Sequence, residues 1–110
     1  MDIAEWRKKI DELDRKMVEL LNERAKAAQE IGRQKRSTAM PIYEPERESK
    51  IFENVKAANR GPLSDLDVTQ VFERIIDIMR NLQKKEIVSE EKEEKLAAGG
   101  GTEFDSDVNE

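Results

Sequence analysis

One uninterrupted helical pattern at the start of the chain limits the folds open to these 110 residues. Asp2 and Glu5 have the spacing of a capping box, so we predict a helix from about Ile3 to about Arg36. At 1.5 Å per residue it is about 50 Å long, whereas a compact domain of this size has a radius of gyration of about 12 Å. The helix therefore overhangs its own domain, and we expect a second chain to cover the excess. Apolar residues on one face of this helix recur in steps of three and four, at Ile3, Trp6, Ile10, Leu13, Met17, Leu20, Ala27 and Ile31.

Two further helices are predicted after a loop at about residues 37–43. The second runs from about residue 44 to about residue 58, with Pro45 in the first turn, where proline is tolerated. A Gly-Pro stop within residues 59–63 separates it from a third helix, which runs from residue 64 or 65 to about residue 88. No strand pattern competes, so the predicted fold class is all-α, a three-helix chain with one long and two shorter helices. Trp6, Phe52 and Phe72 are interpreted as core residues.

The net charge of −5 is distributed unevenly along the chain. Residues 86–110 carry a net charge of −7, whereas residues 1–85 carry +2. We therefore predict a helical domain over residues 1–88 and an acidic, Gly-containing, disordered tail over residues 89–110. The slightly basic domain suits a small anionic ligand better than nucleic acid, because no Arg/Lys face with interleaved aromatic residues is present.

Cysteine and histidine are both absent. Their absence excludes disulfides, Cys-containing zinc sites, thiol nucleophiles and Ser-His-Asp triads, and we expect neither a metal nor a cofactor. The sequence shows no apolar run long enough for a membrane span and no signal-peptide pattern, so we expect a cytoplasmic protein without a membrane partner. Any chemistry here rests on Arg, Lys, carboxylates, amides and hydroxyls.

Polar residues interrupt the apolar face of all three predicted helices. Arg24 takes the place of a leucine on the first, and Lys35, 11 residues later, faces the same side about 16 Å away. Arg47 and Glu48 lie one turn before the apolar face of the second helix, and Gln83 lies one turn after that of the third. Arginine is rarely buried without a partner. Because all three helices place polar groups on their apolar faces, we predict that these groups together form one anion site. The alternative for each residue alone is a solvated or locally paired side chain.

The ordered set of these residues resembles the all-helical (AroQ-type) class of chorismate mutase over about residues 3–85. The resemblance implies an intertwined homodimer of three-helix chains with two active sites, each lined by both subunits. It also implies rearrangement of chorismate to prephenate on the route to phenylalanine and tyrosine, without a covalent intermediate. The motifs that carry the resemblance are Arg7-x-x-Ile10-Asp11-x-x-Asp14, Leu20-Leu21-x-x-Arg24, Lys35, Arg47-Glu48 and Gln83.

The resemblance implies a role for each matching position. Arg24 would bind one substrate carboxylate and Arg7 the other. Lys35 and Gln83 would donate hydrogen bonds to the ether oxygen, and Glu48 would accept one from the ring hydroxyl. If these roles hold, Arg7 serves the partner chain's site, because 17 residues of straight helix, about 25 Å, separate it from Arg24.

Three further positions lie beside these. Arg47 would orient the site and add positive potential. Glu44 stands where many relatives have Asp, and Met79 stands where a small polar residue is common.

Other functions remain open on the sequence. Isochorismate pyruvate lyase resembles this family in fold and arginine placement, although Glu48 suits the hydroxyl of chorismate better. A non-catalytic regulatory or dimerisation module is disfavoured, because no Arg, Lys or Gln of the set is missing. A helical interaction protein with solvated charges is the third alternative. A fused or activating enzyme of the shikimate pathway is neither indicated nor excluded.

Overall fold

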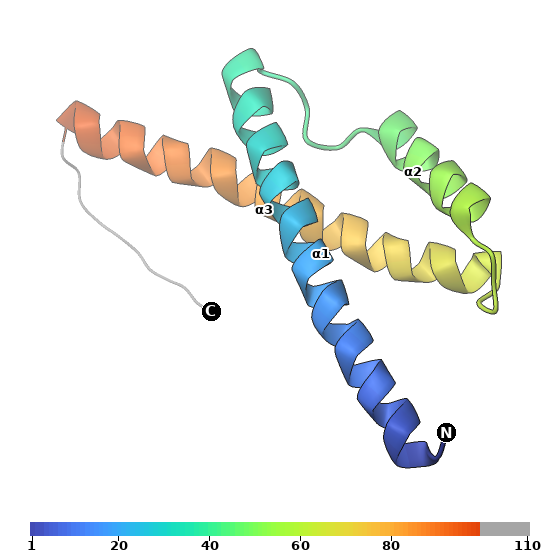
Figure 1. Ribbon diagram of the computed structural model, residues 1–110. Coiled ribbons are helices and arrows are strands. Elements are labelled where there is room, and N and C mark those ends of the chain that lie inside the picture. Colours follow the sequence, from blue (N-terminus) through green and yellow to red (C-terminus); the bar gives the residue numbers. More distant parts are fainter. Residues whose placement is uncertain (100–110) are drawn as a thin grey trace.

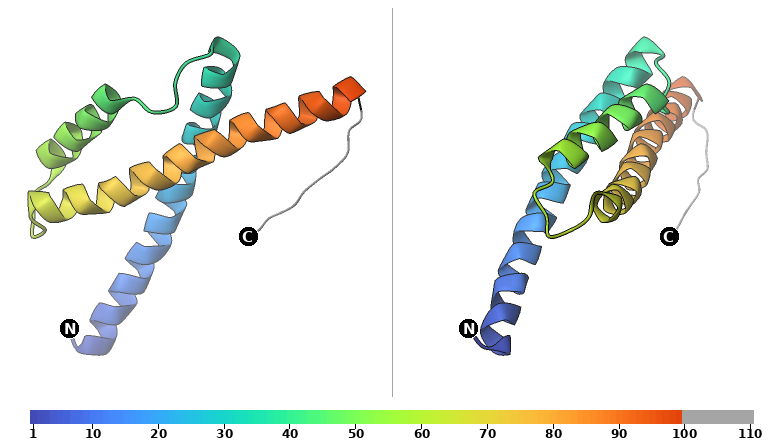
Figure 2. Two further views of the ribbon diagram at one scale, coloured as in Figure 1. Left: turned by 180° about the vertical axis from the view of Figure 1, so that it is seen from behind. Right: turned by 90° about the vertical axis from the view of Figure 1, so that its right-hand side faces the viewer.

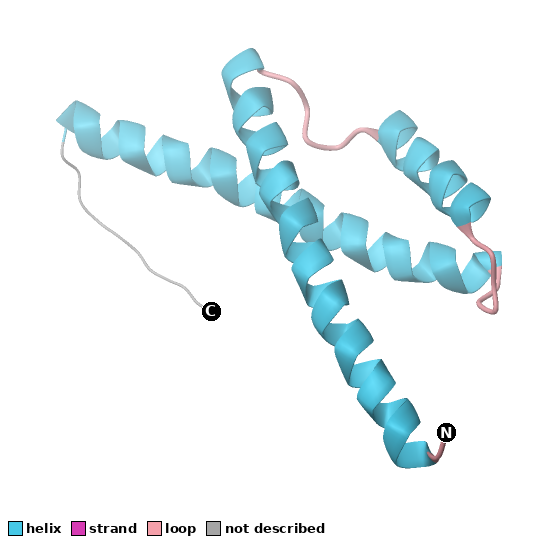
Figure 3. Ribbon diagram, viewed as in Figure 1, coloured by secondary structure: helices cyan, strands magenta, loops and turns pink. Residues whose placement is uncertain are grey.

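A computed structural model describes the backbone of residues 1–99 and the side chains of residues 1–88, and residues 1–99 contain three helices. The helices are α1 (Ile3–Thr38), α2 (Pro45–Ala58) and α3 (Asp65–Gly99). No strand occurs within residues 1–99 (Figure 3). The predicted all-α fold class is therefore confirmed.

The helices form an elongated arrangement in which α1 crosses α3 near the middle of both (Figures 1 and 2). α2 lies along the N-terminal half of α3 and packs on it. The N-terminal half of α1 projects away from the other two helices. The radius of gyration is 18.7 Å, well above the value expected for a compact domain of this length. The predicted overhang of α1 is thus present in the single chain.

Local interactions explain where the helices begin and end. Asp2 caps α1, since its side chain accepts a hydrogen bond from the Glu5 amide at 2.9 Å. α1 ends where Ala39 adopts the left-handed conformation, with φ of 57°. At the start of α3, the Ser64 hydroxyl accepts from the Asp67 amide at 3.0 Å. These ends lie within two residues of those predicted.

The end of α3 differs from the prediction. We expected the helix to stop at about Val88, but it continues to Gly99. Residues 90–98 are all Glu, Lys, Leu or Ala, which are good helix formers, and neither Gly nor Pro interrupts them. The acidic composition that suggested disorder is therefore compatible with a helix up to residue 99. The predicted disorder of residues 100–110 lies outside the described residues.

The interior of the single chain is small. Among residues 1–88 the buried apolar side chains are Ala28, Ile76 and Met79. Gly32 is also buried, and a Cβ atom added to it would lie 3.1 Å from Cα of Gln83. That distance is tighter than most Cβ contacts, so a side chain at residue 32 would require α3 to shift by a few tenths of an ångström, and glycine permits the close approach of α1 and α3.

The apolar face on the overhanging half of α1 is uncovered. Its side chains are between 45% and 69% exposed, at Ile3, Trp6, Ile10, Leu13, Met17 and Leu20. Trp6, interpreted from the sequence as core, is therefore not core in the single chain, because nothing in α2 or α3 reaches that part of α1. Phe52 and Phe72 are partly buried. No helix within residues 1–99 combines the length and the apolar character that a bilayer crossing requires.

Candidate active site

A cavity of about 410 Å³ lies where the C-terminal half of α1, the loop at residues 39–44, α2 and α3 meet. A volume of this size suits a small organic ligand. Seven of the eight site residues predicted from the sequence line this cavity: Arg24, Lys35, Glu44, Arg47, Glu48, Met79 and Gln83. The rest of the lining consists of Ala27, Ala28, Ile31, Ile42, Ile51, Ile76 and Arg80.

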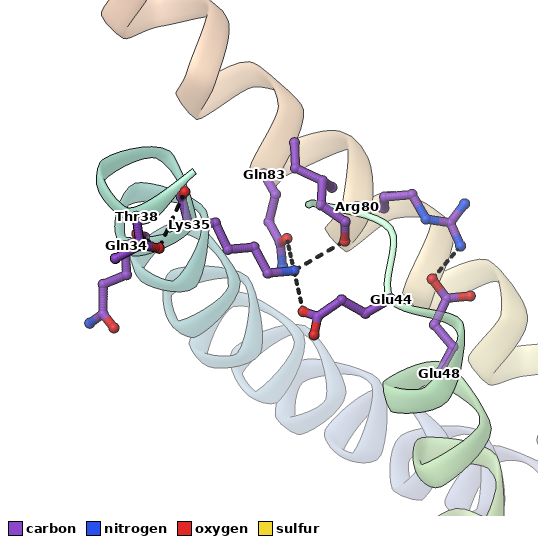
Figure 4. Close-up of polar contacts among 8 residues, drawn as sticks. Gln34, Lys35, Thr38, Glu44, Glu48, Arg80 and Gln83 are labelled. Atoms are coloured by element: carbon purple, nitrogen blue, oxygen red, sulfur yellow. Dashed lines mark hydrogen bonds and ion pairs between the residues drawn. The ribbon is translucent and has the colours of Figure 1, made fainter. Parts of the chain in front are cut away.

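The Lys35 ammonium is the centre of a polar cluster in the cavity (Figure 4). Its Nζ donates to the Ile42 carbonyl at 3.0 Å and to Oε1 of Gln83 at 3.1 Å, and pairs with Oε1 of Glu44 at 2.7 Å. An ammonium has three N–H donors, so these three acceptors satisfy it. Lys35 is only 6% exposed. The contact also orients the Gln83 amide, whose oxygen faces Lys35 and whose nitrogen is left to donate elsewhere.

Glu48 and Arg80 form a second polar cluster (Figure 4). Nη2 of Arg80 lies 2.6 Å from Oε2 of Glu48, and Nη1 lies 3.4 Å from Oδ1 of Asp77. The Arg80 guanidinium also lies over the Tyr43 ring, 5.1 Å from its centroid. The hydrogen bond to Glu48 is the main cause that raises the pKa of Arg80 above its ordinary value.

Arg24 and Arg47 make no hydrogen bond and no ion pair with the side chains of residues 1–88. Burial, and then the positive charge of Arg47, lower the pKa of Arg24. The two other cations of the cavity are each paired with a carboxylate. Two positive charges are therefore left for a ligand, which makes the cavity complementary to a small dianion.

Met79 and Arg7 differ from the other predicted site residues. Met79 is buried in the cavity wall and offers a thioether but no hydrogen-bond donor. Arg7 is exposed on the overhanging half of α1 and does not line the cavity of its own chain. Seventeen residues of helix, about 25 Å, separate it from Arg24.

Two polar groups of the site were missed from the sequence. Arg80 lies four residues after Ile76 and three before Gln83, so helical spacing already placed it on the face that carries Gln83. Ile42 contributes through its backbone carbonyl. No side-chain pattern signals such a contact.

Fold and cavity together define an all-helical protein with a cationic site for a small dianion. Within that class, the sequence matches the chorismate mutase type II family over residues 6–84. The match spans more than half of the chain, and the chain belongs to this family.

Individual relatives agree with this assignment. The chorismate mutase of Methanocaldococcus jannaschii is 33% identical over 84 residues, which cover 76% of this chain and 85% of that protein. The solved chorismate mutase of Thermus thermophilus (form II) superposes with a TM-score of 0.73 at 33% identity, covering 74% of this chain and 93% of that one. The names of these relatives support neither of the alternatives considered from the sequence, isochorismate pyruvate lyase and a non-catalytic regulatory or dimerisation module.

Some relatives are much longer. The bifunctional chorismate mutase/prephenate dehydratase of Aquifex aeolicus is 38% identical over 88 residues, which cover 76% of this chain but 24% of that protein. The chain thus spans about a quarter of this relative.

Proposed function

We infer that the protein is an isomerase that converts chorismate to prephenate, the step that leads toward phenylalanine and tyrosine. The observation that carries this inference is the pair of unpaired guanidinium groups, Arg24 and Arg47, beside the Lys35–Gln83 donor pair in one cavity. Chorismate is a dianion, and the unpaired positive charge of the cavity complements its negative charge.

The reaction suits a site without a nucleophile. In a Claisen rearrangement one C–O bond breaks while one C–C bond forms within a single molecule, and no proton is transferred to or from the protein. Catalysis then depends on holding the substrate in a chair-like conformation and on stabilising the negative charge that develops on the ether oxygen. Groups already fixed in place supply this stabilisation without reorganising during the reaction.

In this proposal Gln83 and Lys35 act on the ether oxygen. The amide nitrogen of Gln83 donates directly, since its amide oxygen already accepts from Lys35 at 3.1 Å. The Lys35 ammonium adds positive potential, and one of its N–H groups is shared between the substrate and a present acceptor.

The remaining residues hold the rest of the substrate. Arg24 binds one carboxylate, Arg47 adds positive potential beside it, and Glu48 accepts a hydrogen bond from the ring hydroxyl. Glu44 holds Lys35 through the 2.7 Å ion pair. Met79 packs against the apolar side of the ring.

We also propose that the working protein is an intertwined homodimer in which Arg7 of one chain binds the second carboxylate in the partner's cavity. The exposed apolar face of the overhanging half of α1 supports this proposal. Burial of apolar surface stabilises association by about 25 cal/mol per Å² before the costs of association. A second α1 helix would cover this face and bring its own arginine to the cavity.

The decisive experiment follows the absorbance of chorismate after addition of the purified protein, with isochorismate as a parallel substrate. We expect chorismate to be consumed and prephenate to form without pyruvate. Sedimentation at the assay concentration is expected to show a dimer. Absence of turnover, together with no binding of a bicyclic transition-state analogue, would contradict the proposed activity.

A further inference from the structure

The ion pair between Arg80 and Glu48 joins α3 to α2 at the wall of the cavity. The 2.6 Å separation of Nη2 and Oε2 is short even for a charge-assisted hydrogen bond. Both side chains are largely shielded from water, at 25% and 20% exposure. Such a contact restricts the rotamer of Glu48 more strongly than an exposed surface pair would.

Arg80 is itself held by other parts of the chain. Its guanidinium lies 5.1 Å from the Tyr43 ring centroid and 3.4 Å from the Asp77 carboxylate. Tyr43 belongs to the loop before α2 and directly precedes Glu44. Arg80 is therefore fixed by contacts to the loop, to α2 and to its own helix.

The pairing occupies only one oxygen of Glu48. Oε2 accepts from Arg80, whereas Oε1 makes no hydrogen bond with the side chains of residues 1–88. A carboxylate oxygen accepts about two hydrogen bonds, so Glu48 keeps the capacity to accept one from a ligand.

Without Arg80, the cations left for Glu48 in the cavity are the unpaired Arg24 and Arg47. A Glu48 carboxylate released from Arg80 would be drawn toward these guanidinium groups, because a charge-assisted hydrogen bond is about twice as strong as a neutral one. That movement would remove the acceptor and neutralise part of the anion site.

We propose that Arg80 is a positioning residue that holds Glu48 away from the unpaired arginines and aims its free oxygen at the ring hydroxyl of the substrate. The proposal rests on the proposed function, since it assumes that the ligand has carboxylates and a hydroxyl. Selectivity for the hydroxyl is then a property of the Arg80–Glu48 pair rather than of Glu48 alone.

The test compares two bicyclic transition-state analogues, one with the ring hydroxyl and one without it. Affinities are measured for the wild type, for Arg80→Met, and for Arg74→Met as a control on an exposed arginine of the same helix. The wild type and Arg74→Met are expected to prefer the hydroxylated analogue by about tenfold or more, the worth of one hydrogen bond to a charged group. Arg80→Met is expected to reduce this preference to about twofold or less, with kcat/KM for chorismate about tenfold lower.

A merely structural role for Arg80 predicts weaker binding of both analogues with their ratio unchanged, and that result would overturn the proposal. If Arg80→Met does not fold, Arg80→Gln carries the same comparison, because it removes the charge and keeps a polar side chain. A wild type that turns over chorismate but shows no preference for the hydroxyl overturns this inference alone. A wild type that neither turns over chorismate nor binds either analogue overturns the proposed function as well.

Discussion

The ammonium of Lys35 donates a hydrogen bond to the amide oxygen of Gln83 at 3.1 Å, although the two residues are 48 positions apart. The contact lies beside Gly32, where α1 and α3 come close together. It leaves the amide nitrogen of Gln83 as the free donor. Two groups proposed to act on one substrate atom are therefore set in position by each other before any ligand arrives.

Replacing Lys35 by Met is predicted to lower turnover far more than it weakens binding. The charge that the ammonium meets develops mainly in the transition state, so kcat should fall by about 100-fold while KM changes by about threefold or less. Steady-state kinetics measure both. Lys50→Met serves as a control, because Lys50 is an exposed lysine on α2 outside the cavity. A change confined to KM would contradict the role given to Lys35.

The variant Gln83→Glu is predicted to make the enzyme dependent on acid. The wild-type amide donates at any pH, so its turnover should be nearly flat across neutral pH. A carboxylic acid donates only while protonated, and the ordinary pKa of Glu is about 4.3, so activity should rise as the pH falls toward 5 and below. Gln70→Glu, at an exposed position of α3, controls for the added charge. Equal activity of the Gln83→Glu enzyme at pH 8 would remove the role on the ether oxygen.

Gly32→Ala is predicted to destabilise the fold and impair the site together. In an open helix position the change should stabilise by about 1 kcal/mol. Here the new methyl group would lie 3.1 Å from Cα and 3.3 Å from Cβ of Gln83, and overpacking of this kind costs about 1–3 kcal/mol. Urea unfolding should show a net loss of stability, and kcat should fall because Gln83 moves relative to Lys35. If Gly32→Ala instead stabilises the protein, as it would in an open helix position, α1 and α3 can move apart to accommodate the methyl group.

Arg47→Met is predicted to stabilise the ligand-free protein while weakening substrate binding. The charge of Arg47 lowers the pKa of Arg24, so the two cations repel each other when both are charged. Because Arg47 is exposed, water already screens much of this repulsion, so removing one charge should raise Tm by about 1 °C at low salt. The gain should disappear at high ionic strength, because salt screens what remains. Thermal unfolding and kcat/KM are measured beside Arg74→Met. A lower Tm for Arg47→Met would indicate a partner for Arg47 that stabilises the fold.

Mixing two inactive variants is predicted to restore activity. Arg7→Ala and Arg24→Ala should each be poorly active alone. In a mixed dimer, one cavity receives Arg24 from one chain and Arg7 from the other, whereas the second cavity lacks both. An equal mixture, unfolded and refolded together, should recover about a quarter of wild-type activity, since half of the dimers are mixed and each has one intact site. No recovery would place Arg7 outside the partner's site.

Much of the fold follows from local sequence signals. Asp2, Pro45 and Ser64 mark the helix starts, and the apolar spacing identifies the faces. The predicted end of α3 was wrong, because we interpreted the acidic composition as disorder. Glu and Lys favour a helix when no Gly or Pro interrupts them. The exposure of Trp6 in the single chain was not predicted either, since periodicity identifies an apolar face but does not show which chain covers it.

Seven of the eight predicted site residues line one cavity. Five of them could be placed there because they interrupt an apolar helix face or extend it by one turn, whereas Glu44 and Met79 followed from the family resemblance. The contacts that these residues make were harder to predict from the sequence. That Lys35 binds the Ile42 carbonyl depends on the path of a loop, and that Glu48 pairs with Arg80 depends on how α2 lies on α3. Such contacts are set by tertiary geometry, which a single sequence does not specify.

The three buried apolar side chains of residues 1–88, Ala28, Ile76 and Met79, also line the cavity. In a larger enzyme the hydrophobic core is separate from the active site, so core mutations that raise stability leave the reacting groups in place. Residues 1–88 of this chain contain no such separate core. Any repacking of these positions reshapes the ligand's surroundings at the same time. Changes that strengthen the protein without altering its specificity must therefore be sought at helix ends and on outer surfaces, where the ligand is not a neighbour.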